Sequence, residues 1–79
     1  MRIMAYKNRV LRGKVMYKNL LRTSDNFALY EIIEEVPLDE AGIYETSYPY
    51  EEIIDVERLW GHKVRVKYTY LEPVLHTEQ

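Results

Sequence analysis

The sequence contains no cysteine and no apolar run long enough to cross a membrane as a helix. The first absence excludes disulfides, thiolate nucleophiles and zinc sites built on cysteine, and it fits a reducing compartment. A membrane-spanning helix needs about 20 predominantly apolar residues, and the beginning of the chain lacks the apolar segment of a secretion signal. We therefore expect a soluble, cytoplasmic protein.

Residues that carry catalysis or bind ions are also scarce. The chain has two serines and two histidines, and no spacing between them suggests a nucleophile held beside a base: Ser24, Ser47, His62 and His76. The three glycines are isolated, which excludes a glycine-rich phosphate loop. The acidic residues occur singly or as adjacent pairs, and neighbours on a strand point to opposite faces of a sheet. We predict no enzymatic activity, no metal site and no cofactor.

Charge is abundant and is arranged in blocks. The net charge is only −2, but residues 1–22 carry seven basic side chains and no acidic one. Residues 23–57 carry eleven acidic side chains and no lysine or arginine, and residues 58–79 are basic again. All three blocks are rich in Ile, Val, Leu and Tyr, which is typical of folded segments and not of disordered tails.

Alternation of apolar and polar side chains predicts most of the strands. It runs through residues 9–21, 43–48 and 61–73, and a more continuous apolar run fills residues 27–36. Residues 23–26, Thr-Ser-Asp-Asn, favour a turn, so the first and second strands should form a hairpin. This hairpin would place the basic block beside the acidic block, where opposite charges stabilise cross-strand pairs.

Two places along the chain are less regular. Gly13 interrupts the first alternating run, where we expect a bend or bulge of the kind that a tight barrel needs. In the segment 49–60, the run from Ile53 to Val56 favours a short strand, and the Glu-Arg-Leu-Trp sequence that follows favours one helical turn. The alternative is a helix over about 49–60, with Ser47 as its cap and Gly61 beyond its end.

These elements predict a mainly β fold: a small antiparallel barrel of four to five strands with one short helical turn. It would form a single domain over residues 1–79, with flexible ends in the first few residues and in 74–79. The stretch SYPYEEIIDVERLWGHKVRVKY resembles the closing segment of small SH3-like or OB-like barrels. A helix at 49–60 would instead give an α+β fold. A resemblance of fold carries no function with it.

A tyrosine-rich segment around the second proline is the first candidate binding surface. Its members are three tyrosines and the two acids that follow them: Tyr44, Tyr48, Tyr50, Glu51 and Glu52. Tyrosine offers a large contact area at little entropic cost and is enriched at protein interfaces. The alternative is that these rings pack over the open end of the barrel.

A basic strand face is the second candidate surface. It would be formed by six side chains: Arg9, Arg12, Lys14, Lys18, Arg65 and Lys67. Small barrels bind single-stranded nucleic acids by combining a basic groove with aromatic rings. Against this use, a phosphate backbone would also meet the eleven carboxylates, and electrostatics must supply most of such affinity. We expect this basic edge to face mainly the protein's own acidic residues.

The sequence therefore predicts a small non-enzymatic binding module that recognises another protein or a second copy of itself. An acidic, tyrosine-rich surface would let it act as an inhibitor or regulator, and we expect a homodimer at micromolar concentration. The alternative is a small barrel that binds single-stranded nucleic acid through the basic face.

Overall fold

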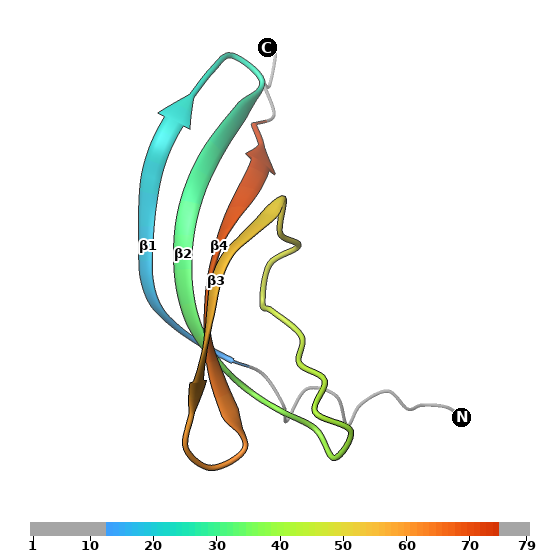
Figure 1. The fold of residues 1–79 in the computed structure, drawn as a ribbon. Coiled ribbons are helices and arrows are strands. Elements are labelled where there is room, and N and C mark those ends of the chain that lie inside the picture. The colour runs from blue at the N-terminus through green and yellow to red at the C-terminus, as the bar shows by residue number, and fades with distance from the viewer. Residues whose placement is uncertain (1–12, 75–79) are drawn as a thin grey trace, which may run out of the picture.

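The computed structural model describes residues 13–74, which form one antiparallel sheet of four strands (Figure 1). The strands are β1 (Lys14–Thr23), β2 (Phe27–Pro37), β3 (Glu52–Leu59) and β4 (Lys63–Pro73). Their order in the sheet is β1-β2-β4-β3, so β2 and β4 are central and β1 and β3 form the two edges. The prediction of a mainly β fold is confirmed.

Both hairpins turn at residues suited to turns. Between β1 and β2, the Ser24 N–H donates to the Phe27 carbonyl at 2.8 Å. Between β3 and β4, Gly61 has a φ of 83°, a left-handed conformation that glycine adopts without a Cβ clash. The predicted hairpin of the first two strands is confirmed, and its register sets Lys14 of the basic block opposite Glu35 of the acidic block.

The core lies on one face of the two central strands. It consists of five buried side chains: Ile32, Val36, Val64, Val66 and Tyr68. They alternate along β2 and β4 with side chains of the opposite face, as a half-buried strand requires. Burying a side chain of this size contributes about 1.5–3 kcal/mol. β1, by contrast, is exposed along its whole length.

An irregular segment, residues 38–51, covers the core face. It follows β2 and runs lengthwise along the sheet to the beginning of β3 (Figure 1). At one end the Leu38 N–H donates to the His62 carbonyl at 2.8 Å, and at the other the Glu51 N–H donates to the Thr69 carbonyl at 2.7 Å. We call residues 38–51 the covering segment.

The covering segment contains the predicted strand at 43–48, which is not one of the strands of the sheet. Its alternation has a different cause. Tyr44, Thr46 and Tyr48 turn toward the sheet and are half-buried, whereas the residues between them are exposed. A chain that lies flat on a core therefore shows the same period of two without any strand partner.

Residues 49–60 form a strand where they are regular. The alternative of a helix is wrong, because Ile53 pairs with Tyr68 and Val56 pairs with Val66 in the ladder of β3 and β4. Residues 13–74 contain neither the expected helical turn nor any helix long and apolar enough to cross a membrane. The sheet is open: β1 and β3 lie at opposite edges, so closure into a barrel is not seen in the described residues.

Gly13 immediately precedes β1, the first strand within the described residues. The irregularities of β1 lie further along, between Val15 and Tyr17 and between Leu20 and Arg22. The first four residues of the predicted strand at 9–21 lie outside the described residues, as do nearly all of the ends that we expected to be flexible.

Candidate functional site

Glu34 is the one charged side chain that is buried among residues 13–74, with an exposed fraction of 0%. Its carboxylate accepts hydrogen bonds from the Tyr68 hydroxyl at 2.6 Å and from the Ser47 hydroxyl at 2.5 Å. The Ser47 N–H also donates to both carboxylate oxygens at 3.0 Å. A buried charge is tolerated only when such donors replace water. Glu34 thus connects β2 to β4 and to the middle of the covering segment.

Tyr68 remains a neutral donor to this carboxylate over a wide pH range. Burial raises the pKa of the Tyr68 phenol above its ordinary value, and the hydrogen bond to Glu34 and its negative charge raise it further. The Tyr68 hydroxyl therefore keeps its proton at neutral pH and donates it to Glu34.

Gly13 closes the space above Glu34. A Cβ at this position would overlap a carboxylate oxygen of Glu34, a methyl group of Val36 and the backbone carbonyl of Glu35. Only a residue without a side chain lets the backbone pass this close. The glycine that suggested a barrel bend thus serves a close approach to the buried carboxylate.

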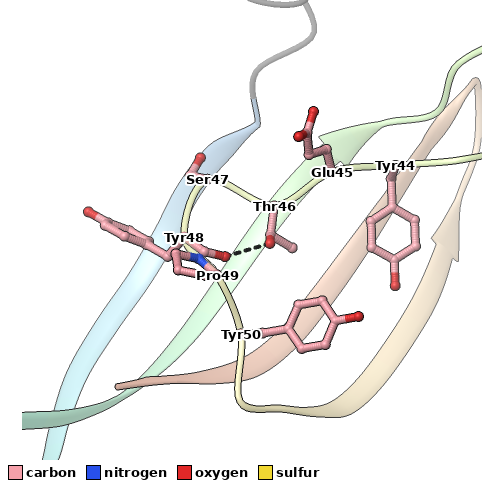
Figure 2. Close-up of a pocket in the computed structure, with 7 residues that line it drawn as sticks. All are labelled: Tyr44, Glu45, Thr46, Ser47, Tyr48, Pro49 and Tyr50. Atoms are coloured by element: carbon pink, nitrogen blue, oxygen red, sulfur yellow. Dashed lines mark hydrogen bonds between the residues drawn. The ribbon is translucent and has the colours of Figure 1, made fainter. Parts of the chain in front are cut away.

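Near the contact between Ser47 and Glu34, the covering segment curves around a hollow of about 560 Å³. The hollow is lined by residues of the segment itself, Tyr44 to Tyr50 (Figure 2). The Thr46 hydroxyl donates to the Tyr48 carbonyl at 2.6 Å and holds the curve. Figure 2 shows the rings of Tyr44 and Tyr50 on the same side of the segment and the Tyr48 ring pointing away from them.

Tyr48 packs within the molecule. Its ring stacks on Tyr70 at a centroid distance of 4.5 Å, and Tyr70 in turn stacks on Tyr30 at 6.3 Å. The Lys18 ammonium lies 4.8 Å from the Tyr48 ring and 4.6 Å from the Tyr30 ring. Tyr44 also packs against the core. For these two tyrosines the structure favours packing over the sheet, the second of the two interpretations drawn from the sequence.

Tyr50 differs from the other two tyrosines. Its side chain is 53% exposed although its ring meets that of Tyr68 edge-on at 6.4 Å. Glu51 and Glu52, which follow it, are exposed, and so is Glu45 across the hollow. The predicted site therefore divides into two packed rings, Tyr44 and Tyr48, and an exposed group formed by Tyr50 and the acids.

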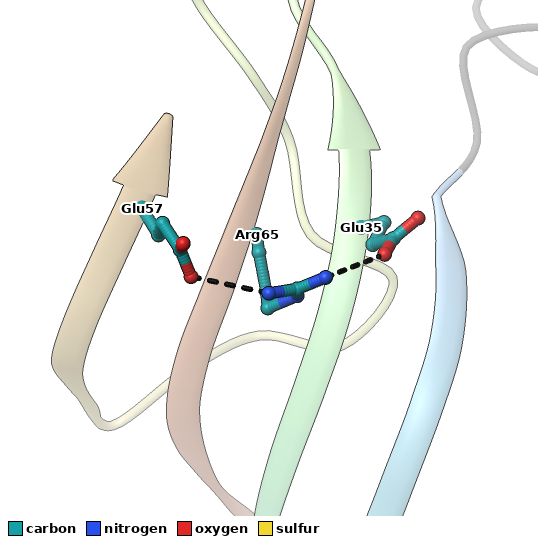
Figure 3. Close-up of polar contacts among 3 residues, drawn as sticks. All are labelled: Glu35, Glu57 and Arg65. Atoms are coloured by element: carbon teal, nitrogen blue, oxygen red, sulfur yellow. Dashed lines mark hydrogen bonds and ion pairs between the residues drawn. The ribbon is translucent and has the colours of Figure 1, made fainter. Parts of the chain in front are cut away.

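The predicted basic surface is not gathered into one patch. Arg65 bridges two glutamates on the face opposite the core, Glu57 at 3.1 Å and Glu35 at 3.2 Å (Figure 3). The hydrogen bond to Glu35 raises the pKa of the Arg65 guanidinium, and the charges of both glutamates add to this effect. Lys67 lies 3.5 Å from Glu31.

The remaining basic candidates are distributed between the faces. Lys18 lies on the core face over the tyrosine rings, whereas Lys14 is paired opposite Glu35 on the other face. Arg9 and Arg12 lie outside the described residues. Two of the basic side chains thus face the protein's own acids, as the charge blocks suggested.

Sequence reasoning missed two features. Glu34 was counted only among the eleven acids of residues 23–57, although it occupies the same alternating phase as Ile32 and Val36 and could have been placed in the core on that basis. Trp60, at the β3–β4 turn, is 94% exposed. It borders a second hollow of about 490 Å³, lined by Glu35, Leu59, Trp60, Gly61, Lys63 and Arg65.

Comparison of the chain with family models, curated proteins and solved structures gives no match. Within residues 13–74, no three histidine or acidic side chains converge in a way that could hold a metal ion. The function proposed below therefore rests on the geometry of the tyrosine-rich hollow and on its charge.

Proposed function

We propose that this protein is a small non-enzymatic binding module that recognises a basic segment of a partner protein through Tyr50 and the neighbouring acids. One observation carries the proposal: Tyr50 is 53% exposed at the rim of a hollow formed by a fixed segment. Exposed aromatic rings beside a concave surface are typical of the central anchors of protein interfaces.

The anchoring of the covering segment supports this function. Glu34 holds the segment at Ser47, and backbone hydrogen bonds hold it at Leu38 and Glu51. A surface that is ordered before binding loses little conformational entropy when a partner arrives. The buried carboxylate thus contributes to binding through the shape of the segment and without touching the partner.

The charge of the surface supports a basic partner. Glu45, Glu51 and Glu52 are exposed around Tyr50, and the block that carries them, residues 23–57, contains eleven acids and no lysine or arginine. An acidic field of this kind raises the association rate of basic partners and disfavours acidic ones. The arginine or lysine of such a partner can also lie over the tyrosine ring.

The alternative function, binding of single-stranded nucleic acid, has less support. Arg65 and Lys67 are engaged by glutamates, and Lys18 lies on the opposite face from them. A backbone of phosphates would have to displace these carboxylates. An inhibitory or regulatory role remains compatible with a protein-binding surface and needs no further residue.

Selection of displayed peptides against the immobilised chain tests the proposal. We expect basic peptides to be enriched and their binding to weaken by about 1–3 kcal/mol, or about 5- to 150-fold, in Tyr50→Ala. Tyr17→Ala is the matched control, because Tyr17 is 45% exposed on β1, away from the hollow. Enrichment of acidic peptides, or equal effects of the two variants, would contradict the proposal.

A further inference from the structure

Within residues 13–74, each of the two outer strands of the sheet has one edge with no neighbouring strand. β1 and β3 each pair with one neighbour within the described residues, so the other side of each strand presents backbone N–H and C=O groups for a further strand. β1 is exposed along all ten of its residues, and half of them are large and apolar: Val15, Met16, Tyr17, Leu20 and Leu21. An edge with this much exposed apolar surface is a template for pairing with another chain.

The charges of the two edge strands have opposite sign. β1 carries three basic side chains and no acid: Lys14, Lys18 and Arg22. β3 carries one arginine and three acids: Glu52, Asp55, Glu57 and Arg58. The two edges of one molecule are therefore complementary to each other, and neither is complementary to itself.

The register places most of these charges on the same face of the sheet. Lys14 lies opposite Glu35, Glu35 opposite Arg65, and Arg65 opposite Glu57, so Lys14 and Glu57 end the same row. Arg22 is on this face as well, because its partner Leu29 is in phase with Glu35 along β2. The three acids of β3 face the same way, opposite Arg65, Lys67 and Thr69.

We propose that β1 of one copy pairs antiparallel with β3 of a second copy, so that the sheet continues from one molecule to the next. Each neighbouring pair in the order β1-β2-β4-β3 is antiparallel, so β1 and β3 run in opposite directions. A second copy in the same orientation then sets its β3 antiparallel to β1 and its acids on the face of Lys14 and Arg22. This assembly shares Glu52 with the partner site but does not involve Tyr50 itself.

Pairing of identical edges is disfavoured by the same charges. Two β1 strands would bring lysine and arginine together, and two β3 strands would bring acids together, and like charges across a strand pair are destabilising. Lysine on an edge strand is itself a device that prevents such self-pairing. The contact is therefore between unlike edges, and it repeats from copy to copy instead of closing as a two-fold dimer.

Sedimentation of the full chain over a range of concentrations, with two charge-reversal variants, tests the proposal. The first variant, Lys14→Glu with Arg22→Glu, changes β1, and the second, Glu52→Lys with Asp55→Lys, changes β3. We expect the average mass of the unchanged protein to rise with concentration and the association constant of each variant to fall at least about tenfold. An equimolar mixture of the two variants should associate again.

A β3 variant that associates as the unchanged protein does would overturn the proposal in favour of contact through identical β1 edges. A protein that is monomeric at every concentration would also overturn the proposal, and the edges of β1 and β3 would then be available only to a different protein. A salt series on the unchanged protein gives a separate answer if a variant loses its β-sheet spectrum. Raising the ionic strength from about 0.01 to about 1 M shortens the Debye length from about 30 to about 3 Å and should weaken the contact between opposite charges. Association that strengthens or stays constant as salt is added would refute the pairing of β1 with β3.

Discussion

Tyr68 donates a hydrogen bond of 2.6 Å to the carboxylate of Glu34, and both side chains have an exposed fraction of 0%. The two residues lie on the central strands β4 and β2, and the covering segment seals them from water through Ser47. A charged group in this position makes the fold depend on its donors, because an unpaired buried charge is far more costly than a paired one.

Removing the Tyr68 hydroxyl should therefore destabilise the protein. We expect Tyr68→Phe, which keeps the ring, to lower the free energy of unfolding by about 1.5–3 kcal/mol, the usual value of a hydrogen bond to a charged group. Urea denaturation measures this change. Tyr70→Phe is the matched control, since it removes a hydroxyl from the same face that is not bonded to Glu34. Similar losses of unfolding free energy in both variants would mean that the hydrogen bond to Glu34 contributes no more than any other tyrosine hydroxyl on this face.

Alkaline pH should weaken the fold through the same residue. The pKa of Tyr68 is raised in the folded state above the value of about 10 expected when unfolded. Above about pH 10 the folded protein then binds more protons than the unfolded chain, so its stability is full below this pH and falls as pH rises further. Melting temperature against pH should show this decline in the unchanged protein and a shallower one in Tyr68→Phe. Equal slopes of melting temperature against pH in the two proteins would contradict a raised pKa of Tyr68 in the folded state.

The second strand illustrates what the sequence can predict. The continuous apolar run over residues 27–36 predicted a strand there, and two of its residues, Ile32 and Val36, are core residues. Glu34 lies between them in the same alternating phase, but from the sequence it was counted only as one of the eleven acids of residues 23–57. Its donors, Ser47 and Tyr68, are 13 and 34 positions away, and no local pattern shows that they converge.

The same limit applies to the strand expected at 43–48. Alternation reports that a chain has an apolar side and a polar side, and Tyr44 and Tyr48 do face the sheet. It does not report whether the backbone has a neighbouring strand, because that depends on where other segments of the chain lie. For the candidate site, the sequence found the exposed Tyr50 but could not separate it from the packed rings.

The backbone at the beginning of β1 should not tolerate a side chain at Gly13. We expect Gly13→Ala to cost about 1–3 kcal/mol, because the added methyl group overlaps Glu34, Val36 and a backbone carbonyl. Denaturation of the single variant and of Gly13→Ala in a Glu34→Ala background measures the effect. The methyl group should cost less in the second background, where the carboxylate is gone. An unchanged denaturation midpoint for the single variant would contradict the close approach.

Lys18 should stabilise the packed tyrosines by a small amount. Its ammonium lies 4.6 Å from the Tyr30 ring and 4.8 Å from the Tyr48 ring, and a cation over a ring at an exposed site contributes about 0.5–1 kcal/mol. Lys18→Met keeps the apolar stem and removes the charge. A double-mutant cycle with Tyr48→Leu isolates the contact between Lys18 and Tyr48. A coupling energy of zero would show that this contact contributes nothing to stability.

Ser47 offers a test that joins the buried carboxylate to binding. Ser47→Ala removes the hydroxyl that lies 2.5 Å from Glu34 but keeps the backbone N–H that also donates to it. We expect the free energy of unfolding to fall by about 1–3 kcal/mol and the amide of residue 47 to exchange its hydrogen faster, because the covering segment is held by one bond fewer. Binding of a peptide selected through Tyr50 should weaken as well, since the segment must then be ordered on binding. Faster exchange with unchanged affinity would show that binding at the hollow does not depend on the hydrogen bond between Ser47 and Glu34.

Tyr50→Ala should produce the reverse pattern, a loss of affinity with unchanged exchange at residue 47. Together the two variants separate the contribution of the Tyr50 ring to binding from the contribution of the ordered covering segment.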